Sequence, residues 1–271
     1  MQERMPVLRE ERPRIRSSRK LIFFLVLLFI TLLAVLFFRS SLSKVAQIDI
    51  QGNSALSAEE IGQAAGIENG DNFFGFRSAA VEARLRKLPA IEKATVRKKF
   101  PGSLTLIVEE YPRVAFQIRP DGQKEMLLAN GLAIPVKDNG IVVDKPILSG
   151  WEEGSEWKLK LCQTLRLISD KTLAEISEIK PSPTYTYEDK IKMYTRSQFE
   201  VYTTVTYLQD KIQYLSEMIE QMSDKSVDSG VFELLEANTH IPFEQYYGTA
   251  DSSKNADGKK GNAPAGSKKA N

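Results

Sequence analysis

The chain has 271 residues, a net charge of +2 and one cysteine, which excludes an intramolecular disulfide framework. The first 20 residues carry seven basic and three acidic side chains, residues 251–271 carry five lysines and two aspartates, and residues 39–250 between these basic ends carry −5. A nucleic-acid-binding protein would concentrate its lysine and arginine on the folded part, so this class is disfavoured. The roughly 210 residues between the ends suffice for one large domain or two small ones.

Residues 21–38 read LIFFLVLLFITLLAVLFF, without a charge, and predict a transmembrane helix. At about 1.5 Å per residue they cover roughly 27 Å, close to the hydrocarbon thickness of a bilayer. The excess of positive charge in residues 1–20 predicts a cytoplasmic tail, with residues 39–271 outside the cell. A cleaved secretory signal is the alternative, but its apolar region is usually shorter and Ser41-Leu42-Ser43 is a poor cleavage site.

The first part of the external chain predicts a small sheet with two helices on one face. Ser57 and Glu60 have the spacing of a capping box, and Pro89 follows the apolar stripe of the second helix. The expected order is strand 45–51, helix 58–65, a helix from 78 to 88, strand 91–99 and strand 103–110. An aromatic loop, residues 73–76, lies between the helices, and we expect it to pack against them rather than to contact a partner.

The second part predicts a mostly antiparallel β domain with flanking helices, so the fold class is α+β. Asn130-Gly131 is a strong hairpin signal. The expected strands are 114–119, 125–129, 132–135, 174–179, 190–195, 200–204 and, last, 231–237; the expected helices are 155–169 and 207–222. Residues 249–271 are rich in Ser, Asn, Gly, Ala and Lys and predict a disordered tail, which we interpret as a solvated tether.

The chain offers few residues for catalysis or metal binding. His240 is the only histidine and Cys162 the only cysteine, so triads and zinc sites lack their usual side chains. We expect His240 in a solvated loop and Cys162 as a small buried thiol. No phosphate-binding loop is present. Two distant carboxylates, as glycosidases use, leave no sequence pattern, but nothing indicates a large sugar cleft. We therefore predict no catalytic, cofactor-binding or metal-binding residues and no cofactor.

Two segments behind the apolar run resemble the bacterial FtsQ/DivIB family of division proteins. The first, SKVAQIDIQGNSALSAEEI, is a strand that ends at Gly52-Asn53 and leads to a capped helix. The second, KKFPGSLTLIVEEYPRVAF, matches the spacing of the family's proline, alternating apolar residues and glutamate, and slips by one residue near Tyr111. The resemblance covers about residues 20–248, and the short basic tail and Lys-rich end look like the Gram-positive DivIB form.

The resemblance implies a POTRA domain over residues 39–112 and the family's β domain over residues 113–248. It also implies a non-enzymatic scaffold at the division septum that binds the coiled-coil proteins FtsL and DivIC, the latter called FtsB in other bacteria. A membrane-anchored extracytoplasmic sensor and a cell-wall polymer-binding protein remain alternatives. In the POTRA part, strand addition by a translocating chain and a rigid-spacer role also remain open.

A sheet edge offers unpaired backbone groups to which an extended partner segment can add. The family resemblance assigns partner binding to the last predicted strand and to two tyrosines after it. These residues are Val231, Phe232, Glu233, Leu234, Leu235, Glu236, Tyr246 and Tyr247. The competing interpretation is an interior strand whose apolar residues only fill the core.

Overall fold

The computed structural model describes residues 19–136 and 143–248. The predicted tails, residues 1–18 and 249–271, lie outside the described residues. The described chain divides into two compact units. Unit 1 comprises residues 19–88 and 93–109, and unit 2 comprises residues 89–92, 110–136 and 143–248.

Unit 1 begins with α1, Arg19–Arg39, which forms because its sequence is apolar on every face and contains no helix breaker. Its one polar side chain between the charged ends, Thr31, donates its hydroxyl to the carbonyl of Leu27 at 2.8 Å. No residue of α1 is buried. Within the described ranges, α1 is the one helix long and apolar enough to cross a membrane, and it covers the predicted span 21–38.

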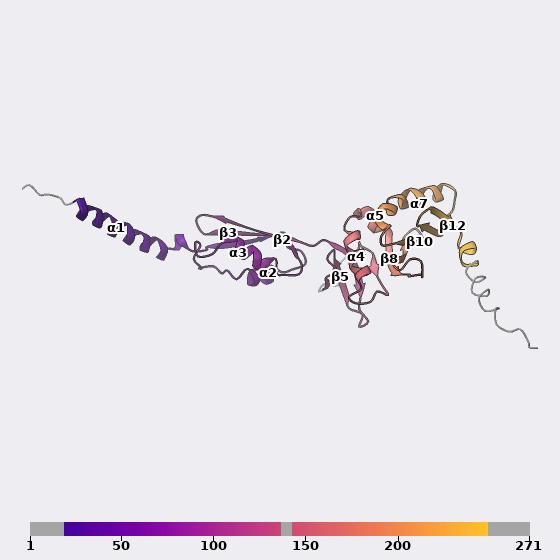
Figure 1. Ribbon diagram of the computed structural model, residues 1–271, viewed down its shortest axis with the longest axis horizontal. Helices are drawn as coiled ribbons and strands as arrows, with labels where there is room; N and C mark the ends of the chain where they lie inside the picture. The colour runs from indigo at the N-terminus through magenta and orange to yellow at the C-terminus, as the bar shows by residue number, and fades with distance from the viewer. Residues whose placement is uncertain (1–18, 137–142, 249–271) are drawn as a thin grey trace, which may run out of the picture. The chain divides into compact units, whose positions relative to one another are not determined.

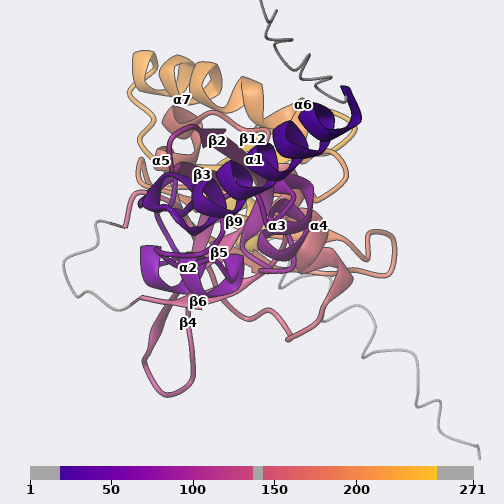
Figure 2. The same cartoon turned by 90° about the vertical axis from the view of Figure 1, so that its left-hand side faces the viewer.

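The rest of unit 1 is a three-stranded sheet with two helices, which lie side by side (Figures 1 and 2). Its elements are β1 Gln47–Gln51, α2 Ala58–Ala65, α3 Ser78–Leu85, β2 Ile91–Lys99 and β3 Ser103–Glu110. The strand order is β1-β3-β2, and β1 runs parallel to β3. The predicted capping box is confirmed: Ser57 Oγ accepts the amide of Glu60, and the Glu60 carboxylate accepts the amide of Ser57 at 2.8 Å.

The turn after β1 places the backbone of Gly52 directly against the backbone of β3. Gly52 has φ +86°, and a Cβ added there would lie 2.2 Å from the carbonyl oxygen of Val108 on β3. Real side chains never approach that closely, so only glycine fits this position. The turn therefore fixes how the chain leaves β1 on its way to α2.

Unit 2 contains a nine-stranded, mostly antiparallel sheet in the order β12-β11-β10-β9-β8-β7-β4-β5-β6. Three neighbouring pairs are parallel: β10 with β11, β4 with β7, and β7 with β8. The strands are β4 Arg113–Ile118, β5 Lys124–Leu128, β6 Ala133–Pro135, β7 Ile147–Leu148, β8 Ile176–Pro181, β9 Lys190–Thr195, β10 Phe199–Thr204, β11 Gly230–Leu234 and β12 Asn238–Ile241.

Helices pack their apolar stripes on one face of this sheet (Figure 1). They are α4 Glu156–Leu165, α5 Asp170–Glu175, α6 Leu208–Lys211, the 3₁₀ turn Ile212–Tyr214 and α7 Leu215–Asp224. Leu161 and Cys162 of α4 are fully buried against strand residues such as Val201 and Phe232. The expected buried thiol is confirmed, and burial raises the pKa of Cys162 to about 11, so the thiolate is scarce at neutral pH.

The α+β class is confirmed, but several predicted elements are wrong in detail. The strand predicted over 174–179 begins only at Ile176, as β8, because Ser169 Oγ accepts the Thr172 amide at 3.2 Å and starts α5, which continues to Glu175. The helix predicted over 207–222 is interrupted by the 3₁₀ turn Ile212–Tyr214. The strand predicted over 231–237 ends at Leu234, and β12 follows after a three-residue turn.

Candidate functional site

The partner-binding residues predicted on β11 lie on both faces of the sheet. Phe232 and Leu234 point into the core, where both are fully buried. Val231 and Glu233 alternate with them and face the other side. Leu235 and Glu236 lie in the turn that follows, and Glu236 is exposed. The structure therefore does not bring the predicted residues together on one surface.

The expectation that residues 231–237 form the edge of the sheet is wrong. β11 pairs on one side with β10 and on the other with β12, so its backbone is already engaged on both sides. β12 ends the order of strands, and in the described ranges no strand pairs with its outer side. The edge available for strand addition is therefore Asn238–Ile241, whose first two side chains, Asn238 and Thr239, are exposed.

His240 lies within this edge strand and not in a solvated loop, so that expectation is also wrong. Its ring lies 5.4 Å from the ring of Phe232 and 6.1 Å from that of Phe199. Its Nε2 is buried next to Gly230 and has no hydrogen-bond partner within the described chain. The imidazole therefore acts as a flat packing group that seats β12 on the end of the core.

A half-buried ion pair organises the sheet face opposite the core helices. The Lys192 ammonium on β9 lies 2.9 Å from the Glu200 carboxylate on β10. Three tyrosine rings surround the ammonium, from Tyr194 at 4.7 Å, Tyr202 at 5.5 Å and Tyr247 at 5.8 Å. Burial disfavours the charge, but the hydrogen bonds that Lys192 donates to Glu200 and the tyrosines outweigh it and raise the pKa of Lys192. We call these five residues the Lys192 cluster.

The Lys192 cluster holds the helical segment 243–248 on this face. Tyr246 stacks on Tyr202 with ring centroids 5.4 Å apart. The Tyr247 hydroxyl donates to Glu200 and accepts from Lys192 at 3.2 Å. Residues 243–248 are thereby fixed beside the edge strand, and Tyr247 keeps 44% of its surface exposed. Of the predicted residues, the structure brings Val231, Glu233, Tyr246 and Tyr247 to this face together.

The side chains of Tyr187 and Lys211 hold the turn between β11 and β12. The Tyr187 hydroxyl donates to the Glu236 carboxylate, which lowers the pKa of Glu236 and raises the pKa of Tyr187 to about 12. Lys211 Nζ donates to the carbonyl of Glu236 at 3.2 Å and to Asn238 Oδ1 at 3.0 Å. These contacts fix the start of the edge strand against α6.

We expect unit 2 to lose stability between pH 10 and 12. Burial, the first cause for both groups, raises the pKa of Tyr202 and Tyr246 from 10.0 to about 12. The unfolded chain then releases these protons at a lower pH than the folded chain, so the stabilisation is complete below pH 10 and disappears as the pH rises through 12. Urea unfolding followed by circular dichroism at increasing pH measures this loss.

Tyr202→Phe should flatten this alkaline decline because it removes one of the two shifted phenols. Tyr185→Phe is the matched control, since Tyr185 is fully exposed and should leave the pH profile unchanged. An identical profile for the parent and Tyr202→Phe would contradict the expected role of the buried phenols.

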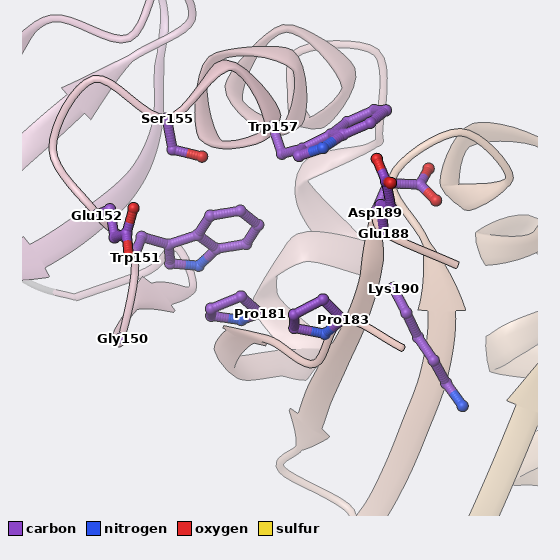
Figure 3. Close-up of a pocket in the computed structure, with 10 residues that line it drawn as sticks. All are labelled: Gly150, Trp151, Glu152, Ser155, Trp157, Pro181, Pro183, Glu188, Asp189 and Lys190. Atoms are coloured by element: carbon purple, nitrogen blue, oxygen red, sulfur yellow. The ribbon is translucent and has the colours of Figure 1, made fainter. Parts of the chain in front are cut away.

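A cavity of about 270 Å³ lies near the start of β9, where Lys190 is one of its lining residues (Figure 3). Its walls include Trp151 and Trp157, the only two tryptophans of the chain, together with Pro181 and Pro183. Trp151 Nε1 already donates to the carbonyl of Ile179 at 3.1 Å, so the indole presents its face to the cavity. The cavity can hold a small apolar or cationic group, but it contains no histidine or cysteine that could act as a nucleophile or general base.

In the part of the chain that the structure describes, no group of three or more His, Cys, Asp or Glu side chains is placed to hold a metal ion. The features that dominate the site are therefore a strand edge and a tyrosine-covered face. The Lys192 cluster was not predicted from the sequence. Its only signal was the alternation of Lys190, Lys192 and Tyr194 with buried Ile191 and Met193, which marks a second, half-covered face.

Comparisons with known proteins agree on one family. The family model described as "POTRA domain, FtsQ-type" matches residues 43–111, and "Cell division protein FtsQ/DivIB, C-terminal" matches residues 117–234. The Cell division protein DivIB of Paenibacillus polymyxa is 43% identical over 240 residues, which cover 89% of this chain and 92% of that protein. The DivIB protein of Brevibacillus brevis is 35% identical over 243 residues, with coverages of 89% and 91%.

A solved structure of the major extracytoplasmic domain of the division protein DivIB from Geobacillus stearothermophilus is also similar. It shares 25% sequence identity and a TM-score of 0.36, over 43% of this chain and 97% of that one.

These findings define a class: cell-division proteins that carry an FtsQ-type POTRA domain behind one apolar helix of membrane-spanning length. Within that class, the chain belongs to the FtsQ/DivIB family, which confirms the resemblance seen in the sequence.

Proposed function

We propose that this chain is a non-enzymatic scaffold of the division septum whose unit 2 binds FtsL- and DivIC-type coiled-coil proteins. In this proposal, α1 anchors the chain, the basic tail (residues 1–20) lies in the cytoplasm, and the POTRA domain (39–112) and β domain (113–248) lie outside. Family membership supports the division role. The excess of positive charge before α1 supports the orientation.

The observation that carries partner binding is the position of β12 at the end of the nine-stranded sheet. Alternate amide and carbonyl groups of an edge strand point away from the sheet, and an extended peptide can pair with them. A strand added beside β12 continues the sheet and covers Asn238 and Thr239, which are exposed. The edge is short, at four residues, so side-chain contacts must add to the affinity.

The neighbouring helical segment supplies such contacts. Tyr247 is partly exposed, and its hydroxyl is already held by Glu200 and Lys192, so its ring is fixed before a partner arrives. A preorganised aromatic side chain loses little conformational entropy on binding. The docking surface that we propose therefore consists of the outer side of β12 and the exposed part of Tyr247. Phe232 and Leu234 support it from the core without reaching the partner.

Site-specific photo-crosslinking in growing cells tests this proposal. The photoreactive residue p-benzoylphenylalanine replaces Thr239 on β12 or, as a matched control, Pro135 on β6 at the opposite edge of the same sheet. Tagged DivIC and FtsL homologues of the same organism are then detected by immunoblot. We expect crosslinks from position 239 and none from position 135.

Crosslinks of equal yield at both edges, or at neither edge in a chain that still localises to midcell, would contradict docking at β12. A chain that fails to reach midcell altogether would instead contradict the division role. The two failures are distinguished by fluorescence imaging of the same strains.

A further inference from the structure

The end of unit 1 where α1 joins the POTRA domain is built from two segments distant in sequence. The Phe73 amide donates to the carbonyl of Ser43 at 2.8 Å, and the Val45 amide donates to that of Asp71 at 2.8 Å. The Ala46 amide donates to the carbonyl of Gly102 at 2.7 Å. The loop 71–76 and the turn 100–102 therefore flank the chain just after it leaves α1.

Both segments present a phenylalanine at this end. Phe74 is 51% exposed and Phe100 is 54% exposed, with ring centroids 6.3 Å apart. The ring of Phe74 also lies 6.0 Å from that of Phe37 and 6.3 Å from that of Phe38, at the end of α1. The rings thus continue the apolar surface of α1 on to the folded domain. The expectation that the aromatic loop packs only inside its own domain is therefore wrong for Phe74, although Phe73 is buried.

The exposed apolar side chains of unit 1 are concentrated at one end of the folded domain. Among the described residues of unit 1 beyond α1, the exposed large apolar side chains are Leu42, Phe74 and Phe100. All three lie at the α1 end of the domain, and none lies at the other end of β1. Exposed apolar side chains that face only water would not be expected to cluster beside a membrane-spanning segment, whereas a clustered apolar patch marks an interaction surface.

The loop that carries Phe74 is rigid rather than free to fold away. Lys98 Nζ donates to the carbonyls of Phe73 at 2.7 Å and Phe76 at 2.6 Å, and lies 3.7 Å from the centre of the Phe76 ring. The Phe74 amide donates to Asn72 Oδ1 at 2.9 Å. Phe74 is thus held in its exposed position from both sides.

Exposed basic side chains accompany the phenylalanines, as a surface facing phospholipid headgroups requires. Arg39 ends α1, Lys44 follows it, and Lys99 precedes Phe100, and all three are exposed. Aromatic rings at the boundary of the hydrocarbon, with cations at headgroup level, are typical of membrane interfaces.

We propose that this end of unit 1 docks on the membrane that α1 spans, with Phe74 and Phe100 inserted at the level of the lipid headgroups. The inference rests on the proposed anchoring by α1 and deepens it, because the POTRA domain then stands on the bilayer at a fixed height and orientation. The occupant is the phospholipid bilayer itself, since the rings continue the apolar surface of the spanning helix.

Fluorescence quenching in vesicles tests the docking. The full chain is reconstituted in vesicles of phosphatidylglycerol and phosphatidylcholine, with or without phosphatidylcholine brominated close to the headgroup. Single tryptophans are introduced by Phe74→Trp, Phe100→Trp, Leu28→Trp within α1, and Gln51→Trp at the far end of β1. Four steps along β1 place position 51 about 13 Å from position 47, and the parent chain gives the baseline for Trp151 and Trp157.

We expect the added fluorescence at positions 74 and 100 to be quenched by brominated lipid at least twofold more strongly than that at position 51, and to resist quenching by aqueous iodide. Quenching at 74 and 100 equal to that at 51, with position 28 still quenched by lipid, would overturn the docking while leaving the anchor intact. Protection at 74 and 100 from both quenchers would also overturn it, because a second copy of the chain would then cover the rings. Absence of lipid quenching at position 28 would contradict the anchoring on which the inference rests.

Phe74→Tyr combined with Phe100→Tyr provides a second measurement that does not depend on an added tryptophan. Tyrosine keeps the ring and suits the interface, so docking should persist. Phe74→Glu combined with Phe100→Glu should expose the α1 end of unit 1, with faster hydrogen exchange at the amides of loop 71–76 in vesicles. Equal exchange in the two double variants, each with the β1 and β3 amides still protected as a sign of folding, would count against the docking.

Discussion

Phe232→Ala is expected to lower the free energy of unfolding of unit 2 by about 3–5 kcal/mol. Phe232 is fully buried on β11, and its ring stacks on that of Phe199 with centroids 4.7 Å apart. The ring of His240 covers it from β12. Removing the phenyl group leaves a cavity between the strands that carry the proposed docking edge, and the neighbours can close it only in part.

Urea unfolding of the full chain in detergent measures this effect. Both tryptophans lie in unit 2, so their fluorescence reports the unfolding of that unit. Leu167→Ala is the matched control, because it truncates an apolar side chain of unit 2 that is 61% exposed and should cost less than about 1 kcal/mol.

The result also separates two roles for Phe232. If Phe232 supports the edge only from the core, a second variant, Phe232→Leu, should restore most of the stability and with it partner binding. Normal stability together with lost binding in Phe232→Ala would show that the side chain contacts the partner directly, contrary to its burial.

Gly52→Ala is expected to destabilise unit 1 by about 2–5 kcal/mol. About 1–2 kcal/mol comes from holding an alanine at positive φ, and about 1–3 kcal/mol comes from the clash of the new methyl group with its surroundings. The methyl group would lie 2.2 Å from the Val108 carbonyl oxygen, and a backbone atom within a sheet cannot rotate away as a side chain would. The sheet must separate or the turn must change its path.

Gly70→Ala isolates the conformational part of this cost. Gly70 has φ +98°, but an added Cβ would have no atom within 4 Å, so the expected loss is about 1–2 kcal/mol. Hydrogen exchange of the β1 and β3 amides in the full chain gives both values. Equal losses for the two variants would show that the close approach at Val108 contributes nothing.

The elements that sequence analysis predicted well are those fixed by local chemistry. The span 21–38 is apolar on all faces, and Ser57 with Glu60 satisfies the first amides of α2 within four residues. The helix predicted over 207–222 is interrupted, but its apolar spacing correctly indicated which side faces the core. Leu208, Ile212 and Leu215 are all buried, because the 3₁₀ turn keeps them on one side.

The candidate site was harder to predict because pairing between distant strands creates it. β12 has four residues, and Asn238 and Thr239 carry no apolar signal, so its strand character comes from pairing with β11. Lys192 and Glu200 meet only because β9 and β10 are antiparallel neighbours. The alternation of apolar and polar residues can show which face of a strand is buried, but it cannot show which residue of a neighbouring strand lies opposite.

The parallel pairing of β1 with β3 has a mechanical consequence. The chain enters β1 from the α1 end, at Gln47, and leaves β3 at its opposite end, at Glu110. Tension between the anchor and unit 2 would therefore pull two adjacent parallel strands in opposite directions along their length. In that geometry the tension acts as shear on all five residue pairs from Gln47–Ser103 to Gln51–Ile107 at the same time, so the pairs do not separate one after another. Under such tension the POTRA sheet would therefore resist extension along β1 and β3 through all five pairs at once.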